Sequence, residues 1–84
     1  MCSSDLPQTT IRWEIFQSSA VELAVYDLAG RNLRTLVREP MEAGVYSTTW
    51  DGRDSSGRRL PSGTYLVGLR HGTTFENCKI TLLK

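Results

Sequence analysis

The amino-acid sequence predicts an all-β domain, an antiparallel β-sandwich of six to seven short strands. Three observations carry this prediction. Apolar residues recur with a period of two, which is typical of strands with one buried face. Turn-forming residues separate the alternating segments, and no segment shows the period of an amphipathic helix. Short alternating strands at this spacing favour two sheets packed around one core.

The first two strands are expected at residues 9–16 and 21–27, on either side of a polar turn. In both, apolar side chains alternate with polar ones, so that one face is buried and the other is solvated. Tyr26 falls on the outer face of the second strand. A turn follows, in which Gly30 can supply the positive φ that tight turns require.

The third strand, residues 33–39, is less regular than the first two. Leu36 and Val37 interrupt its alternation, and this predicts a β-bulge. Residues 40–44 contain Pro and Gly and predict a break in the chain. The alternation resumes in a fourth strand at residues 45–50, where Tyr, Thr and Trp share one face.

The last two strands are expected at residues 64–70 and 75–83, joined by a two-residue turn at His71 and Gly72. A turn-rich segment, residues 51–63, precedes them. The positions expected to matter for the turns are Gly30, Asp51, Gly52, Gly57, Gly63 and Gly72.

The inward-facing side chains of these strands are enough for one core. Each fully buried aliphatic or aromatic side chain contributes roughly 1.5–3 kcal/mol, although chain entropy offsets most of the sum. The large aromatic residues are interpreted as core and not as a ligand platform. The expected core residues are Ile11, Trp13, Leu23, Val25, Trp50, Tyr65, Val67 and Ile80.

Length and charge exclude several classes of function. A chain of 84 residues predicts a single domain, which leaves little room for a deep active site beside the core. The net charge is +1, and the arginines alternate with acidic residues, so a nucleic-acid groove is not expected. No apolar run is long enough for a transmembrane helix, so direct membrane insertion is not expected either.

The first residues do not continue the strand pattern. We interpret residues 1–6 as an artefactual or disordered leader and residues 7–84 as the domain. Of the two cysteines, Cys2 lies in this leader, so a disulfide framework is not expected. Cys78 is interpreted as a small apolar side chain in a strand and not as a reactive thiol.

Catalytic and cofactor motifs are not found. The only histidine, His71, falls at an expected exposed hairpin tip, where the geometry of proton transfer is hard to fix. The sequence contains no nucleophile elbow, phosphate-binding loop or zinc-ligand pattern. We therefore predict that the chain is not an enzyme and that it binds no cofactor.

The octet Trp50 to Gly57, WDGRDSSG, leaves two interpretations open. Asp51 and Asp54 are weak calcium candidates, because Ca²⁺ prefers several carboxylate and carbonyl oxygens. The spacing of an EF-hand is absent, however, and nearby arginines oppose a cation. A turn is better motivated, because Asp side chains accept hydrogen bonds from backbone amides two residues further on.

Four motifs together resemble the immunoglobulin-like domain first named from the flagellar hook-capping protein FlgD. They are VYDLAGR, WDGRDSSG, SGTY and the closing run KITL, and the resemblance covers residues 7–84. It implies an Ig-like sandwich without catalytic residues, in which the WDGRDSSG segment is a structural turn. Related modules also occur at the C-terminus of large secreted bacterial proteins.

The resemblance implies two functions. We expect first a non-catalytic C-terminal module of a larger secreted protein, which acts in type IX sorting, surface anchoring or accessory binding. Its partners would be secretion or attachment machinery and an upstream passenger domain, and its location would be secreted or at the cell surface. The alternative is an assembly scaffold domain of the flagellar hook cap. Recognition is expected at a strand edge or at an outer face that bears Arg12, Glu14, Glu22 and Tyr26.

Overall fold

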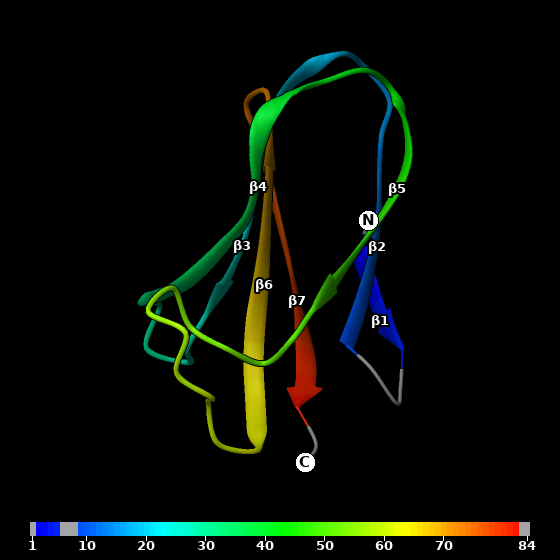
Figure 1. Ribbon diagram of the computed structural model, residues 1–84. Coiled ribbons are helices and arrows are strands. Elements are labelled where there is room, and N and C mark those ends of the chain that lie inside the picture. Colours follow the sequence, from blue (N-terminus) through cyan, green and yellow to red (C-terminus); the bar gives the residue numbers. More distant parts are fainter. Residues whose placement is uncertain (1, 6–8, 83–84) are drawn as a thin grey trace.

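The computed structural model describes the backbone of residues 2–5 and 9–82, and the side chains of residues 10–82. Within these residues seven strands form two antiparallel sheets that pack face to face, and no helix occurs (Figure 1). The predicted β-sandwich is thus confirmed. One sheet has the order β1-β2-β5, with strands Cys2–Asp5, Thr9–Ile15 and Gly44–Trp50. The other has the order β4-β3-β6-β7, with strands Asn32–Met41, Ser19–Tyr26, Gly63–His71 and Thr74–Leu82.

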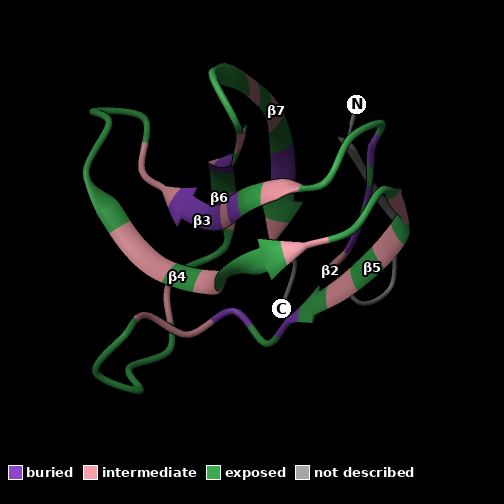
Figure 2. Cartoon of the chain, turned by 90° about the horizontal axis from the view of Figure 1, so that it is seen from above, coloured by how far each residue is buried: buried purple, intermediate pink, exposed green. Residues whose placement is uncertain are grey.

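The core lies between the two sheets and is formed by the inward side chains of their strands (Figure 2). Buried or half-buried residues alternate with exposed ones along β5, whereas β3 and β6 each contain three consecutive buried residues. All eight expected core residues are buried there, with at most 7% of their surface exposed. Trp13 stacks on Tyr46, with 4.7 Å between the ring centroids. Trp50 meets Tyr65 edge to face at 5.5 Å. These ring pairs fill the space between the sheets with large apolar groups.

The bulge predicted in the third expected strand is confirmed. Leu23 of β3 pairs with Val37 of β4, but the next residue, Ala24, pairs with Thr35. Leu36 is therefore the extra residue that bends the strand. A second irregularity follows between Val25 and Tyr26 of β3.

The break predicted at residues 40–44 is confirmed but is shorter than expected, since only Glu42 and Ala43 lie outside the strands. Strand β4 continues through Pro40, which pairs with Ala20, and ends at Met41. Proline has no N–H to donate, but β4 is an edge strand, so the side of Pro40 away from β3 needs no ladder bond. Strand β5 begins shortly after, at Gly44.

The final hairpin differs from the prediction by one residue. His71 ends β6 and pairs with Thr74, so Gly72 and Thr73 form the connection. The His71 side chain is only 17% exposed, and its Nε2 lies 3.0 Å from Glu76 Oε2. The expectation that His71 lies at an exposed tip is therefore wrong, because His71 still belongs to β6 and its imidazole is hydrogen-bonded to Glu76 of β7.

Two features near the N-terminus and in β7 also differ from expectation. Residues 2–5, which we set outside the domain, form β1 and pair with β2. Cys78 of β7 is half-buried, as expected for a side chain in a strand, but it is disulfide-bonded, so the expectation that no disulfide forms is wrong. The strand pattern places a residue on one face of its sheet and does not show which side chain from elsewhere in the chain reaches it.

Candidate functional site

The segment between β5 and β6 is the longest connection between described strands. It begins at Asp51, directly after Trp50, and folds against the start of β4. The amide of Ser55 donates to the carbonyl of Leu33 at 2.9 Å, and the amide of Leu60 donates to Gly52 at 2.9 Å. The first bond ties the middle of the loop to β4, and the second joins the two arms of the loop to each other.

Asp54 organises the centre of this loop. Its Oδ1 accepts hydrogen bonds from the amide of Ser56 at 3.0 Å, from Ser56 Oγ at 2.7 Å and from the amide of Arg58 at 3.0 Å. The backbone closes the same turn, since the Gly57 amide donates to the Asp54 carbonyl. Gly57 has a φ of 90°, a conformation that other residues rarely adopt.

A second turn of the same kind joins β3 to β4. Asp27 Oδ1 accepts hydrogen bonds from the amides of Ala29 at 3.0 Å and Arg31 at 2.9 Å. Gly30 donates to the Asp27 carbonyl and has a φ of 89°. The sequences DLAGR and DSSGR share the pattern D-x-x-G-R, and this was the signal that could have revealed the pair from sequence.

Asp51 joins the loop to β4, whereas Asp54 holds a turn within the loop. Asp51 Oδ1 accepts from Arg34 Nη1 of β4 at 2.7 Å and from the Arg53 amide at 3.1 Å. The carbonyl of Arg53 in turn accepts from the indole of the buried Trp50 at 2.9 Å. The loop is thus joined both to the core residue Trp50 of β5 and to Arg34 of β4 in the four-stranded sheet.

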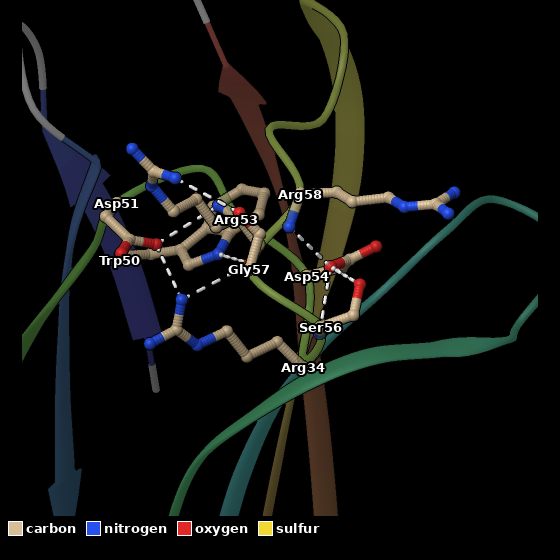
Figure 3. Close-up of polar contacts among 8 residues, drawn as sticks. All are labelled: Arg34, Trp50, Asp51, Arg53, Asp54, Ser56, Gly57 and Arg58. Carbon is tan, nitrogen blue, oxygen red and sulfur yellow. Dashed lines mark hydrogen bonds and ion pairs between the residues drawn. The ribbon is translucent and has the colours of Figure 1, made fainter.

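The two carboxylates address separate sets of donors, as Figure 3 shows. Asp51 faces Arg34 and Arg53, whereas Asp54 faces Ser56 and Arg58. Among the residues with described side chains, no group of three or more His, Cys, Asp or Glu could hold a metal ion. The geometry therefore favours the turn interpretation of this octet over the calcium interpretation.

Hydrogen bonding lowers the pKa of the two turn aspartates. For Asp27 the main cause is the bond from the Arg31 amide, and for Asp54 it is the bond from the Ser56 hydroxyl. The bond to His71 lowers the pKa of Glu76 in the same way. In all three cases the hydrogen bonds favour the charged carboxylate, and these bonds form only when the chain is folded.

The remaining expected turn glycines lie at the ends of strands. Gly52 is buried, with a φ of 78°, and an added Cβ would lie 3.1 Å from Leu82 Cδ1. Gly72 has a φ of 60° in the last hairpin. Gly63 differs, because it opens β6 with a nearly extended φ of 158°.

The expected recognition face does not exist as one surface. Arg12 and Glu14 lie on the outer face of β2, whereas Glu22 and Tyr26 lie on β3 of the other sheet. The two pairs therefore face opposite sides of the sandwich. Neither strand is an edge of its sheet, so strand pairing through them is not available.

The outer face of the larger sheet carries an aromatic patch, which we define as Tyr26, Gly68, Arg70 and Phe75. Gly68 lies on this outer face, and it is buried because the rings of Tyr26 and Phe75 cover it. The Arg70 guanidinium lies 5.6 Å from the centre of the Phe75 ring. In the described chain, no helix is long and apolar enough to cross a membrane.

Comparison with known proteins gives one family match. The sequence model of the family described as FlgD Ig-like domain matches residues 8–73. The basal-body rod modification proteins FlgD of Salmonella typhimurium and Salmonella typhi are each 37% identical over 49 residues. That alignment covers 58% of this chain and 21% of each relative, so the chain spans about a fifth of their length.

A solved structure is also similar. The crystal structure of FlgD from P. aeruginosa superposes with a TM-score of 0.66 and 28% identity, over 86% of this chain and 55% of that one. These similarities overturn the expectation of a type IX secretion tail that is secreted or attached to the cell surface. That expectation is wrong, because the relatives are named as proteins of the flagellar basal body and not as secreted tails.

Proposed function

This chain belongs to the FlgD Ig-like domain family, and from that premise we propose that it is a scaffold domain in assembly of the flagellar hook and rod. The observation that carries the proposal is the family match over residues 8–73. The similarity to two basal-body rod modification proteins supports it. Because the chain covers only 21% of those relatives, the role of the whole protein is part of the proposal.

A scaffold domain has to keep one conformation while its partners bind and dissociate. The rigid loop end supports this role, because Asp27, Asp51 and Asp54 each hold a turn or join two elements. Ser55 links the second turn to the start of β4, so the two D-x-x-G-R turns lie at one end of the sandwich (Figure 1). A rigid end of this kind favours defined contacts with neighbouring subunits.

We infer that the chain has no catalytic activity and needs no cofactor in this role. The carboxylates of the loop are engaged by N–H and O–H donors. The only histidine of the chain, His71, is hydrogen-bonded to Glu76 beside the final hairpin. These contacts support a structural use of groups that a catalytic site would leave available to substrate.

Protein partners fit this family, and we propose that they are the hook and rod proteins of the growing flagellum. The mixed charge of the surface, with a net charge of +1, supports binding to proteins and not to nucleic acid. The proposed location is the flagellum under assembly, and this replaces the expected location in the secreted fraction or at the cell surface.

A chimera would test the proposal in cells. The full chain, which includes β1, would replace the matched segment of FlgD in a Salmonella typhimurium strain that lacks its own copy. We expect hooks, counted by electron microscopy, and swimming in soft agar to be restored at least in part. Crosslinking of the chimera to hook or rod proteins provides a second measurement.

The matched control carries Leu23→Asp, which places a charge at a position with 0% exposure and prevents folding of the domain. This control should give neither hooks nor crosslinks. If the unmodified chimera is folded and present at the normal level, yet gives no hooks and no crosslinks, the scaffold function is wrong for this chain.

A further inference from the structure

Four strands of the described chain have a neighbour on one side only: β1, β4, β5 and β7. Such an edge exposes unpaired backbone N–H and C=O groups, and proteins protect edges with short strands, proline, charges or bulges. Strand β1 has only four residues. Strand β4 carries two arginines, Pro40 and two irregularities, and β7 carries Glu76 and Lys79.

Strand β5 has none of these protections. Its seven residues, GVYSTTW, include no charge and no proline. It pairs with β2 in one unbroken register from Gly44 to Trp50, so no bulge turns its edge away. Val45 is 72% exposed, and Ser47 and Thr49 are also exposed. In Figure 2 the strand lies at the rim of the molecule.

We propose that β5 is a self-association surface, on which β5 of a second copy pairs antiparallel about a two-fold axis through Ser47. An interface of this symmetry needs a surface that is complementary to itself. Side chains keep to their own face only if paired residues are separated by an even number of positions. Of the registers that satisfy this rule, the one centred on Ser47 pairs all seven residues of the strand.

This register places compatible side chains opposite each other. On the outer face Val45 meets Thr49 and Ser47 meets its own copy, so that β-branched and hydroxyl groups pair without charge. On the inner face Tyr46 meets Thr48, and both are only half-buried in the single chain. Aromatic and β-branched cross-strand pairs are favourable, and the contact would cover the open end of the core beside Trp13. The smaller sheet would grow from three strands to six.

The position of Ser47 allows a direct test. In the proposed dimer a charge at residue 47 faces the same charge, so Ser47→Lys and Ser47→Glu should each weaken dimerisation by roughly tenfold or more in sedimentation equilibrium. An equal mixture of the two variants should restore a mixed dimer, because opposite charges then meet. Amides of β5 should exchange with solvent more slowly at high concentration of the unmodified chain.

Two controls show that the effect of a charge at residue 47 is not caused by misfolding and depends on where the charge lies. Arg12 is the cross-strand partner of Ser47 on β2, so the carboxylate of Ser47→Glu lies opposite a cation of its own chain, and this variant should fold normally by circular dichroism. Thr81→Lys and Thr81→Glu make the same changes at an exposed position of β7 and should leave association unchanged. A chain that stays monomeric at millimolar concentration overturns the proposal. So does a dimer that is unaffected by the charges at residue 47, or a mixture that does not recombine.

Discussion

Asp27 and Asp54 hold equivalent positions in two turns of the same construction. Each carboxylate accepts hydrogen bonds from the amides two and four residues further on, and each turn closes on a glycine with a φ near 90°. One turn joins β3 to β4 within a sheet, and the other lies in the long connection from β5 to β6. The same local chemistry thus stabilises two unrelated connections at one end of the sandwich.

Removing either carboxylate should loosen its turn. Asp54→Ala leaves the amides of Ser56 and Arg58 without their acceptor, and Asp27→Ala does the same for Ala29 and Arg31. We expect each change to lower the Tm by several degrees, measured by circular dichroism. Asn variants should lose less, because the amide oxygen can still accept. Ser55→Ala, at an exposed position of the same loop, is the control that should have little effect.

The same carboxylates should make stability depend on pH in the acidic range. The folded-state pKa values of Asp27 and Asp54 are lowered from the ordinary value of 3.8, and that of Glu76 from 4.5. Their stabilisation is therefore complete above these ordinary values and is lost as the pH falls through the folded-state values. The Tm should fall with pH in that range. The difference between the unmodified chain and Asp27→Asn/Asp54→Asn should shrink at the same time, and a constant difference would contradict the assignment.

The two buried tryptophans provide a matched pair of substitutions. Both are 2% exposed, but the Trp50 indole donates to the carbonyl of Arg53, whereas the Trp13 indole has no hydrogen-bond partner among the described residues. Trp→Phe removes the same volume at both sites. Trp50→Phe should cost about 1–2 kcal/mol more in the free energy of unfolding, because only that change breaks a hydrogen bond. Equal losses in urea titrations would show that the bond contributes nothing.

Gly68 should be needed for the aromatic patch. A Cβ at this position would lie 2.8 Å from Tyr26 Cε2 and 3.0 Å from Phe75 Cζ, so the rings would have to move. We expect Gly68→Ala to destabilise the fold by about 1–3 kcal/mol. The cost should be smaller in a Tyr26→Ala background, where the nearest ring is absent. Asn77→Ala, the exposed cross-strand neighbour, is the control.

The sequence by itself determined the strands, the faces they bury and the kind of fold. Alternation with a period of two identified Ile11, Trp13 and Leu23 as inward residues, and all three are buried. The interruption at Leu36 located a bulge. These properties are local, because the side-chain direction in a strand depends only on the position of the residue along that strand.

Only the tertiary structure decided which strands are neighbours. It placed Arg12 and Tyr26 on opposite faces of the molecule, made β4 an edge on which Pro40 is tolerated, and left β5 without protection. It also placed Arg34 of β4 at 2.7 Å from Asp51, which follows β5 of the other sheet. Strand partners are chosen by contacts between residues far apart in the chain, and a periodic pattern carries no information about such contacts.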